Sequence, residues 1–170
     1  MIIRPAKCSD LPAVHAIYAL EVREGTGSFE TTPPDLREIE RRHREVMDAG
    51  LPYVVVDIAG IVAGFAYAHP YHSRAGYRLT VETSIYVARD HQRDGLGSAL
   101  LEQVIKDCIA AGKREVVAII GDSANQGSIR VHEKAGFHLV GTLCGVGSKF
   151  GRFLDVVIMQ RRLADDQATG

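Results

Sequence analysis

The sequence contains no tryptophan and only three cysteines among its 170 residues. The cysteines, Cys8, Cys108 and Cys144, are odd in number, lie far apart and form no CxxC pair. This spacing argues against a disulfide framework and is typical of ordinary buried thiols in a reducing compartment. We therefore expect a cytoplasmic protein.

An excess of charge of one sign is also missing, because 20 Lys and Arg face 21 Asp and Glu, for a net charge of −1. A surface that follows nucleic-acid phosphates usually needs a basic excess. No uninterrupted apolar run approaches the roughly 20 residues that a membrane-spanning helix requires. The first residues, MIIRPAKCSDLP, carry charges and prolines in place of the apolar segment of a signal peptide. We expect neither nucleic acid nor membrane as a partner.

No repeat, low-complexity tract or linker divides the chain. With 46% hydrophobic and 24% charged residues it has the composition of a globular domain. A chain of this length buries roughly 70% of the surface that its unfolded form exposes, so it needs no disulfide or metal to fold. We expect one domain over residues 1–163 and a flexible polar tail, ADDQATG, over residues 164–170.

Apolar periodicity predicts a mixture of strands and helices. The predicted strands cover residues 2–4, 53–57, 61–68, 80–87, 115–120, 137–143 and 153–160. The predicted helices begin at Ser9 as N-cap, at Pro33, at Gly95 and at Gln126, and end near residues 25, 50, 111 and 135. Alternating charges on the second helix indicate a solvated face. Because hairpins come first and strand–helix–strand crossovers follow only after residue 80, the order predicts a mixed α/β sheet that is not doubly wound.

The segment Gln92-Arg93-Asp94-Gly95-Leu96-Gly97, between a strand and a long helix, is the densest candidate motif. Two glycines allow close backbone approach, and a helix start presents unpaired N–H groups and a positive dipole end to an anion. Leu100 stands where a dinucleotide fingerprint would have a third glycine, and no GK[ST] follows for a Walker loop. A pyrophosphate cradle and a glycine-rich helix entry without a ligand both remain open from this segment alone.

Glu82 stands in the middle of a β-rich run, where glutamate is depleted. Strand alternation places Glu82, Ser84 and Tyr86 on one face. A carboxyl group inside a sheet that faces a cleft is a candidate general base, and a solvated edge-strand charge is the alternative.

Histidines and arginines near these motifs allow more than one interpretation. His132 shares a helix face with Asn125 and Ile129, where a lone histidine is more often a core residue than a catalytic group. His69-x-x-His72 lacks a third ligand at zinc spacing, so no metal site is expected. Arg74 and Arg78 could grip an anionic group in bidentate fashion or could be solvated loop residues.

Taken together, these features resemble the GNAT N-acetyltransferase superfamily over nearly the whole chain. The segments YRLTVETSIYV (77–87), HQRDGLG (91–97), SIRVHEKAGF (128–137) and GSKFGRFLDVV (147–157) are similar to its phosphinothricin and methionine sulfoximine acetyltransferase branch. One departure is Phe153, where that branch usually has tryptophan. The resemblance implies the GNAT fold, which is a mostly antiparallel sheet with a splayed parallel centre and helices on both faces.

The resemblance also implies roles for individual residues. The backbone of Ile85, Tyr86 and Val87 would bind the pantetheine arm of acetyl-CoA, and Asn125 would face the same molecule. The pyrophosphate would be held by Arg93, Asp94, Gly95, Leu96, Gly97 and Ser98. Glu82 would be the general base, acting through water. The substrate would lie against Glu82, Thr83, Ser84 and a loop with His72, Ser73, Arg74 and Arg78. His132 takes the place of a tyrosine that protonates the departing thiolate.

The resemblance therefore predicts N-acetylation of a small amino acid-like amine by acetyl-CoA, without a metal. The homodimer that we expect rests on family analogy alone. Two alternatives remain open. The same fold could acetylate a protein N-terminus or lysine, or it could be a non-catalytic acyl-CoA-binding module, against which the retained Glu82 counts.

Overall fold

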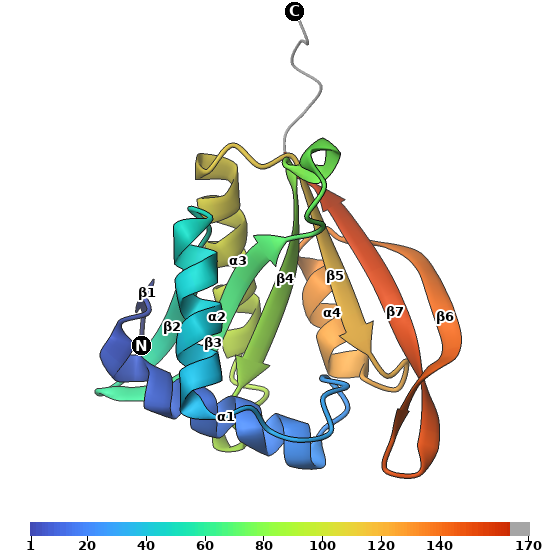
Figure 1. Ribbon diagram of the computed structural model, residues 1–170, viewed down its shortest axis with the longest axis horizontal. Helices are drawn as coiled ribbons and strands as arrows, with labels where there is room; N and C mark the ends of the chain where they lie inside the picture. Colours follow the sequence, from blue (N-terminus) through green and yellow to red (C-terminus); the bar gives the residue numbers. More distant parts are fainter. Residues whose placement is uncertain (164–170) are drawn as a thin grey trace, which may run out of the picture.

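A seven-stranded sheet with the order β1-β2-β3-β4-β5-β7-β6 organises the molecule (Figure 1). The structure, a computed structural model, describes residues 1–163, so the predicted flexible tail lies outside the described residues. The strands are β1 (Ile2–Pro5), β2 (Tyr53–Ile58), β3 (Ile61–Pro70), β4 (Thr80–Val87), β5 (Glu115–Gly121), β6 (His138–Lys149) and β7 (Arg152–Arg162). Within the described residues, β4 and β5 pair in parallel and every other neighbouring pair is antiparallel.

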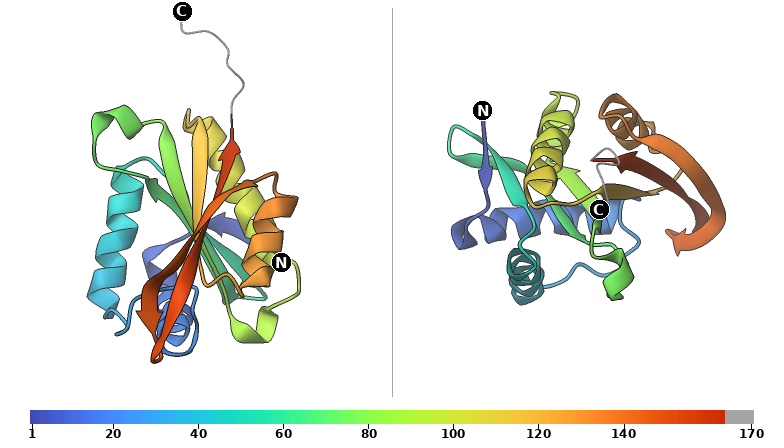
Figure 2. Two further views of the ribbon diagram at one scale, coloured as in Figure 1. Left: turned by 90° about the vertical axis from the view of Figure 1, so that its right-hand side faces the viewer. Right: turned by 90° about the horizontal axis from the view of Figure 1, so that it is seen from above.

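Helices cover both faces of this sheet. Helices α1 (Leu11–Glu24) and α2 (Leu36–Asp48) lie on one face, and α3 (Leu96–Ala110) and α4 (Gln126–Lys134) lie on the other (Figure 2). Short 3-10 turns at Cys8–Asp10, Ala75–Tyr77 and Arg89–His91 complete the elements. The predicted mixed α/β sheet is confirmed, and both layers exist because each sheet face carries apolar side chains that need cover.

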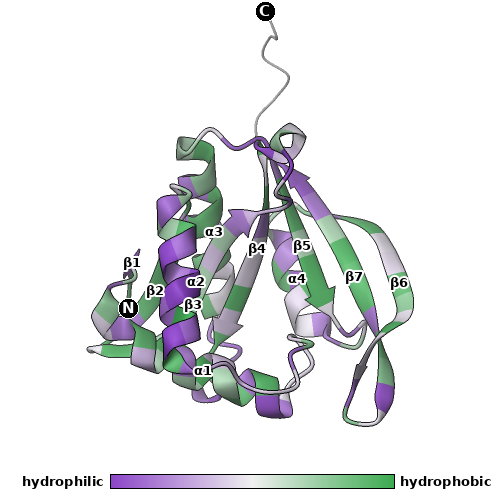
Figure 3. Ribbon diagram, in the orientation of Figure 1, coloured by the Kyte–Doolittle hydropathy of each residue, from purple (hydrophilic) through white to green (hydrophobic). Residues whose placement is uncertain are grey.

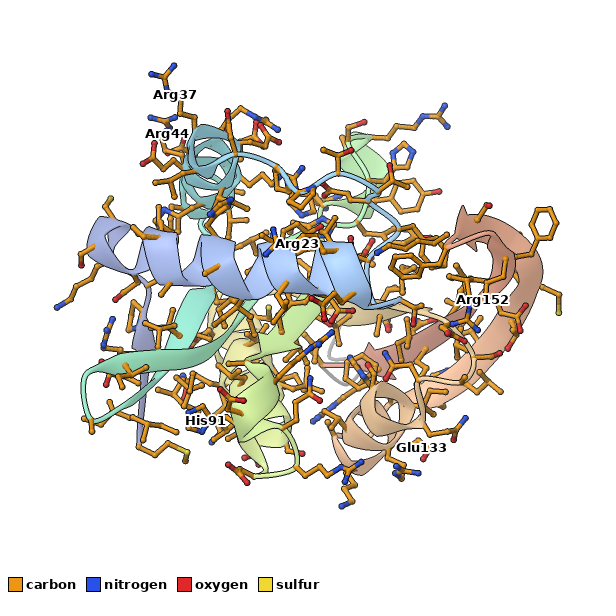
Figure 4. All side chains as sticks on the ribbon, turned by 90° about the horizontal axis from the view of Figure 1, so that it is seen from below. Arg23, Arg37, Arg44, His91, Glu133 and Arg152 are labelled. Carbon is orange, nitrogen blue, oxygen red and sulfur yellow. The ribbon has the colours of Figure 1, made fainter. Side chains whose placement is uncertain are left out.

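Helix α2 shows how the sequence pattern produces this layering. Ile39 and Val46 are buried against the sheet, whereas Arg37 and Arg44 project away from it (Figure 4). The outer surface of α2 is accordingly hydrophilic, while β5 and β7 are mostly hydrophobic (Figure 3). Asp35 caps the helix by accepting a hydrogen bond from the Glu38 backbone N–H at 2.8 Å. The predicted solvated face is confirmed.

The first helix starts later than its pattern predicts. Ser9 was predicted as the N-cap, but it lies inside the 3-10 turn, and α1 begins at Leu11. The Asp10 carboxylate instead accepts hydrogen bonds from the Lys7 N–H at 2.7 Å and from Arg4 at 2.7 and 3.0 Å. These contacts hold Asp10 at the end of the 3-10 turn, and the partner on β1, Arg4, is not part of the local helix pattern.

Strand β6 is much longer than predicted, because the pattern ends near residue 143 whereas the strand continues to Lys149. Gly141, Gly145 and Gly147 weaken the local strand signal. Pairing with β7 continues across them, with register shifts between Leu139 and Gly141 and between Leu143 and Gly147. Tertiary pairing therefore sets the length of this strand.

The three cysteines are free thiols. Cys108 is buried on the inner face of α3, and its burial raises the pKa of the thiol to about 12. The expectation of buried thiols is wrong for Cys8 and Cys144, which are exposed on the 3-10 turn and on edge strand β6. No helix within residues 1–163 is long and apolar enough to span a membrane.

The two central strands separate halfway along their length. Parallel pairing joins Thr80–Thr83 to Glu115–Ala118 and then ends. Beyond that point β4 stays paired with β3, down to Val87 opposite Gly64, and β5 stays paired with β7, down to Gly121 opposite Val156. The sheet thus has a short central seam and an open end, as the resemblance predicted.

Candidate active site at the open end of the sheet

A cavity of about 1100 Å³ occupies the open end between β4 and β5. It is lined by the diverging strand ends, the turn before α3, the start and inner face of α4, and α1. Among its lining residues are Thr83, Ser84, Ile85, Tyr86, Val87, Arg93, Gly95, Leu96, Gly97, Ser98, Asn125 and His132. The structure therefore brings most residues of the predicted acetyl-CoA site around one space. Asp94 is not among them, and its carboxylate lies 3.7 Å from His91 Nδ1.

The glycine-rich turn before α3 forms one side of this cavity. Gly95, the N-cap of α3, has φ +79°, and Arg93 has φ +73°. The left-handed backbone turns the chain sharply into the helix, and the first helical N–H groups have no intrahelical acceptor. A Cβ atom at Gly97 would lie 3.8 Å from Val131 Cγ2 and 3.9 Å from Val87 Cγ2, which is ordinary contact. The packing of the protein therefore leaves room for a Cβ atom at Gly97.

The free edge of β4 forms one wall. From Ser84 to Val87 this edge no longer pairs with β5, so its backbone N–H and C=O groups face the cavity instead of a ladder partner. An extended ligand can hydrogen-bond to such an edge as an added strand would. Asn125 at the start of α4 is held in place because its side chain accepts a hydrogen bond from Ser128 N–H at 3.2 Å.

Glu82 lies on the opposite face of β4 from the α3 packing, toward α1 and α2. Its register partner on β3 is His69, and its Oε1 lies 3.6 Å from His69 Nε2. It is not among the residues that line the large cavity, but Thr83 and Ser84, next to it on the strand, are. Glu82 therefore stands one or two residues from the point where the strands part, on the side away from the α3 turn.

An aromatic layer adjoins Glu82 on the same face. Tyr53, Phe65 and Tyr67 are stacked, with ring centroids 5.0 Å apart for Tyr53 and Tyr67. Tyr86 stacks on Phe65 at 5.1 Å and meets the edge of Tyr18 on α1 at 5.0 Å. Burial raises the pKa of Tyr18 to about 12. These phenols are neutral at physiological pH and form a rigid apolar floor beside the candidate base.

The predicted anion clamp lies on an exposed loop between β3 and β4. His72, Ser73, Arg74 and Arg78 are all exposed. The His72 ring lies 5.0 Å from that of Tyr77, and the Arg74 backbone N–H donates to His72 Nδ1 at 3.2 Å. Within residues 1–163 neither Arg74 nor Arg78 forms an ion pair through its guanidinium group, and neither lines the large cavity. Both guanidinium groups are therefore available to an anionic group from solution.

His132 lines the cavity from α4 and is only 4% exposed. Its Nδ1 lies 2.8 Å from the Ser128 carbonyl oxygen, which can only accept, so Nδ1 carries the proton. Burial lowers the pKa of His132 below its ordinary value, with the Ser128 carbonyl opposing the shift. Nε2 is buried and has no hydrogen-bond partner among residues 1–163. The ring is thus neutral near pH 7, and its free nitrogen is an acceptor.

Sequence reasoning assigned no role to Lys149, which the structure places at a junction. Lys149, 4% exposed near the end of β6, donates to the carbonyl oxygens of Gly25 at 2.8 Å and Ser28 at 2.6 Å. Both acceptors belong to the loop between α1 and α2. Phe29 of the same loop packs so closely on Gly147 that a Cβ atom there would not fit. The loop therefore connects the α1 side of the molecule to the β6–β7 hairpin, across the open end.

The loop contains a second set of polar contacts. Tyr18 Oη donates to Glu30 Oε1 at 2.7 Å and lies 3.0 Å from Ser28 Oγ, and Arg42 of α2 donates to Glu30 at 2.6 Å. No local sequence signal marks Lys149. Its partners, more than 120 residues away, could not be read from the sequence.

The cavity and its cradle can hold an extended phosphate-bearing ligand, and the nearby carboxylate can accept a proton. Within residues 1–163 no group of three or more His, Cys, Asp or Glu side chains is arranged to bind a metal ion.

Comparisons with known proteins bear on this arrangement. Residues 14–137 match the model of the acetyltransferase (GNAT) family. The chain is 46% identical over 161 residues to a phosphinothricin N-acetyltransferase from Alcaligenes faecalis, covering 95% of this chain and 82% of that protein. It is 39% identical over 162 residues to an L-methionine sulfoximine/L-methionine sulfone acetyltransferase from Pseudomonas paraeruginosa, covering 95% and 94%.

A solved structure agrees with the fold over its full extent. The phosphinothricin acetyltransferase from Sinorhizobium meliloti, in complex with acetyl-CoA, superposes with a TM-score of 0.95 at 39% identity, covering 99% of this chain and 91% of that one. The predicted fold and resemblance are confirmed. The glycine cradle, the splayed central strands and these matches together show that the chain belongs to the GNAT family of acetyltransferases.

Proposed function

We propose that the protein transfers the acetyl group of acetyl-CoA to the α-amino group of a small amino acid-like substrate, of the kind named in its relatives. Phosphinothricin and methionine sulfoximine or sulfone are the candidates. The observation that carries the proposal is the cavity at the β4–β5 opening, which is lined by the Gly95–Gly97 turn and by Thr83, the residue next to Glu82 on β4.

Acetyl-CoA is the cosubstrate, and it supplies an activated acetyl thioester. We assign Arg93, Gly95, Leu96, Gly97 and Ser98 to the pyrophosphate, because a helix start with free N–H groups attracts anions. The edge of β4 from Ile85 to Val87 is assigned to the pantetheine arm. N–H groups on this edge can also donate to the carbonyl oxygen where negative charge develops.

Glu82 is assigned as general base. An α-ammonium group has a reference pKa of about 8, so only about a tenth of it is free amine at pH 7. A carboxylate that removes this proton, through water, produces the neutral amine that attacks the acetyl carbon while the C–S bond breaks. Positioned proton acceptors of this type typically contribute about 10²–10⁴-fold to the rate.

For His132 the geometry favours a positioning role over the predicted acid. Its proton is on Nδ1 and is donated to Ser128, so neutral His132 has none on Nε2 to give to a departing thiolate. Its 5.0 Å edge contact with Phe137 fixes α4 against the end of the sheet. In this proposal the thiolate takes its proton from solvent.

The proposal includes a homodimer in the cytoplasm. Strand β6 is the edge of the sheet, and it exposes Leu139, Val140, Leu143 and Val146, while Phe153 on β7 is 79% exposed. Apolar side chains grouped on a sheet edge are typical of association sites. Sedimentation equilibrium measures the oligomeric state of the protein directly. The exposed free thiols of Cys8 and Cys144 fit a reducing compartment.

The function is tested by release of free CoA thiol from acetyl-CoA with a panel of amines. We expect turnover with phosphinothricin, methionine sulfoximine or methionine sulfone, and far less with a short peptide or an uncharged amine. Turnover of the peptide alone would identify a protein acetyltransferase instead. Tight acetyl-CoA binding with no turnover of any amine would identify a binding module.

A further inference from the structure

Glu82, the proposed base, is paired with His69, which has no role in the reaction as proposed so far. They are register partners on the antiparallel strands β3 and β4, so their side chains stand side by side on one sheet face. His69 Nε2 lies 3.6 Å from Glu82 Oε1. This distance is within ion-pair range and a few tenths of an ångström beyond a hydrogen bond.

The orientation of the His69 ring is fixed by its other nitrogen. Nδ1 lies 3.1 Å from the Pro70 carbonyl oxygen, which can only accept a hydrogen bond, so Nδ1 carries a proton in both charge states. Nε2 is therefore the nitrogen that gains or loses a proton, and it faces Glu82. The side chains of His69 and Glu82 are 35% and 24% exposed, so water reaches the pair.

Within residues 1–163, Glu82 is the charged side chain that acts directly on His69. Burial disfavours its charged form, but the Glu82 carboxylate and the Pro70 carbonyl outweigh this, so the pKa of His69 is raised above its ordinary value. The Tyr67 ring, 6.0 Å away on β3, is a neutral phenol whose pKa burial raises. From the helical layer, Arg42 of α2 and Glu30 of the α1–α2 loop act on Tyr67, and they form an ion pair with each other.

We propose that His69 accepts the proton that Glu82 removes from the substrate ammonium group and releases it to water. The inference rests on the proposed function of Glu82. The proton passes from the substrate nitrogen through water to a Glu82 oxygen, from there to His69 Nε2, and from the imidazolium to solvent. Glu82 is thereby returned to its carboxylate form for the next turnover, and His69 acts through Glu82 without touching the substrate.

A definite pH dependence follows. The acceptor is the neutral imidazole, so activity is present above the pKa of His69 and is lost as the pH falls through it. Because that pKa is raised from the ordinary value of about 6.5, the acidic limb of kcat lies above pH 6.5. Replacing His69 by a group that does not titrate removes this limb or moves it to lower pH.

The test compares His69→Gln and His69→Ala with the wild type in acetyl transfer to the best amine of the panel. Near pH 7.5 we expect kcat to fall about 100-fold, the low end of the range for a positioned proton acceptor, with KM for acetyl-CoA unchanged. Imidazole added to His69→Ala should restore much of the lost rate, because it supplies the missing base in the space left by the ring. His138→Gln, an exposed histidine on β6, is the matched control.

A wild-type kcat profile in both variants, without rescue by imidazole, would overturn the inference while leaving the acetyltransferase function intact. Failure of the proposed function is distinguishable, because then the wild type itself would turn over no amine. If both variants fail to fold, NMR titration of His69 in the wild type and in Glu82→Gln decides the matter. The pKa of His69 should drop in Glu82→Gln, and an unchanged value would show that the pair is not coupled.

Discussion

At the scale of single residues, a substitution at Gly97 tests ligand binding without disturbing the packing of the protein. The protein leaves ordinary contact distances for a Cβ atom there, 3.8 Å to Val131 and 3.9 Å to Val87. Gly97→Ala should therefore keep its melting temperature and raise KM for acetyl-CoA about tenfold or more, since small displacements of a bound ligand are costly. Gly141→Ala, a strand glycine with open space around it, is the control. Unchanged acetyl-CoA affinity by calorimetry would contradict the cradle assignment.

A second prediction for a single residue concerns the role of the Glu82 carboxylate as general base. Glu82→Gln keeps the shape and removes the proton acceptor, so kcat near neutral pH should fall by about 10²–10⁴-fold with both KM values similar. The loss should shrink as the pH rises, because the substrate ammonium then ionises without help. Steady-state kinetics from pH 6 to 10 measure this, with exposed Glu102→Gln as control. A loss that is independent of pH and confined to KM would make Glu82 a positioning residue.

The third prediction for a single residue concerns Arg74 as a binding group for the anionic part of the substrate. Its guanidinium group is exposed and unpaired within residues 1–163, so Arg74→Ala should leave stability unchanged. If it binds the substrate's anionic group, KM for the amino acid should rise about tenfold, because hydrogen bonds between charged groups are lost. KM for acetyl-CoA should not move. Arg37→Ala on the outer face of α2 is the matched control. An equal change in KM for the amino acid in both variants would contradict the proposed role of Arg74 in binding the substrate.

Individual residues could be predicted from the sequence where the signal was local. Gly95 and Gly97 stood out because a helix start with glycines has a specific chemistry, and Glu82 because a carboxylate is rare inside a strand. Lys149 and His69 could not be assigned in this way. Their meaning depends on partners, the Gly25 and Ser28 carbonyls and the opposing Glu82, that only the folded chain brings near.

At the scale of elements, long periodic segments were predicted well and irregular ones were not. Helix α3 follows from the spacing of its apolar residues, and strand β4 follows from its run of β-branched and aromatic residues. The start of α1 depends on the Arg4–Asp10 ion pair, and the far half of β6 depends on its pairing with β7 across three glycines. The loop between α1 and α2 has no periodicity, so its position over the open end of the sheet was not predicted.

The prediction at the scale of elements concerns the contacts that hold the loop between α1 and α2. Lys149→Met removes two charge-assisted hydrogen bonds and leaves the Gly25 and Ser28 carbonyls without their donor, at a cost of about 2–4 kcal/mol. We expect a lower melting temperature, faster proteolysis within residues 25–34, and a higher KM for the amine. Lys106→Met, on the exposed side of α3, should change none of these. Unaltered proteolysis in Lys149→Met would show that the loop is held by other contacts.

At the scale of the whole molecule, the sheet consists of two halves, β1–β4 and β5–β7, that share a ladder of only four residue pairs. The mixed topology could be predicted because hairpins and crossovers leave different sequence spacings. The length of the shared ladder could not, because nothing local marks the residue at which two parallel strands part. The cavity, and with it the proposed chemistry, exists because the ladder stops at Thr83 and Ala118.

A ligand in that opening contacts both halves, so it should stabilise the whole fold. At a concentration of 100 times its Kd, acetyl-CoA should add about 2.7 kcal/mol to the free energy of unfolding. For a chain of this size that corresponds to an increase in Tm of about 5–11 °C, measured by calorimetry. Gly97→Ala at the same concentration should show a smaller increase. If Tm did not change in the wild type, acetyl-CoA would not be binding the native state.

The aromatic layer has a consequence for optical measurement. Without tryptophan, near-ultraviolet emission comes from six tyrosines. Four of them, Tyr18, Tyr53, Tyr67 and Tyr86, are close enough to exchange excitation energy, and Tyr86 lines the cavity. The other two, Tyr71 and Tyr77, lie 5.7 Å apart on the loop that carries Arg74. Unlabelled protein therefore carries two intrinsic fluorophore groups, one beside each proposed substrate, and Tyr86→Phe or Tyr77→Phe would tell their signals apart.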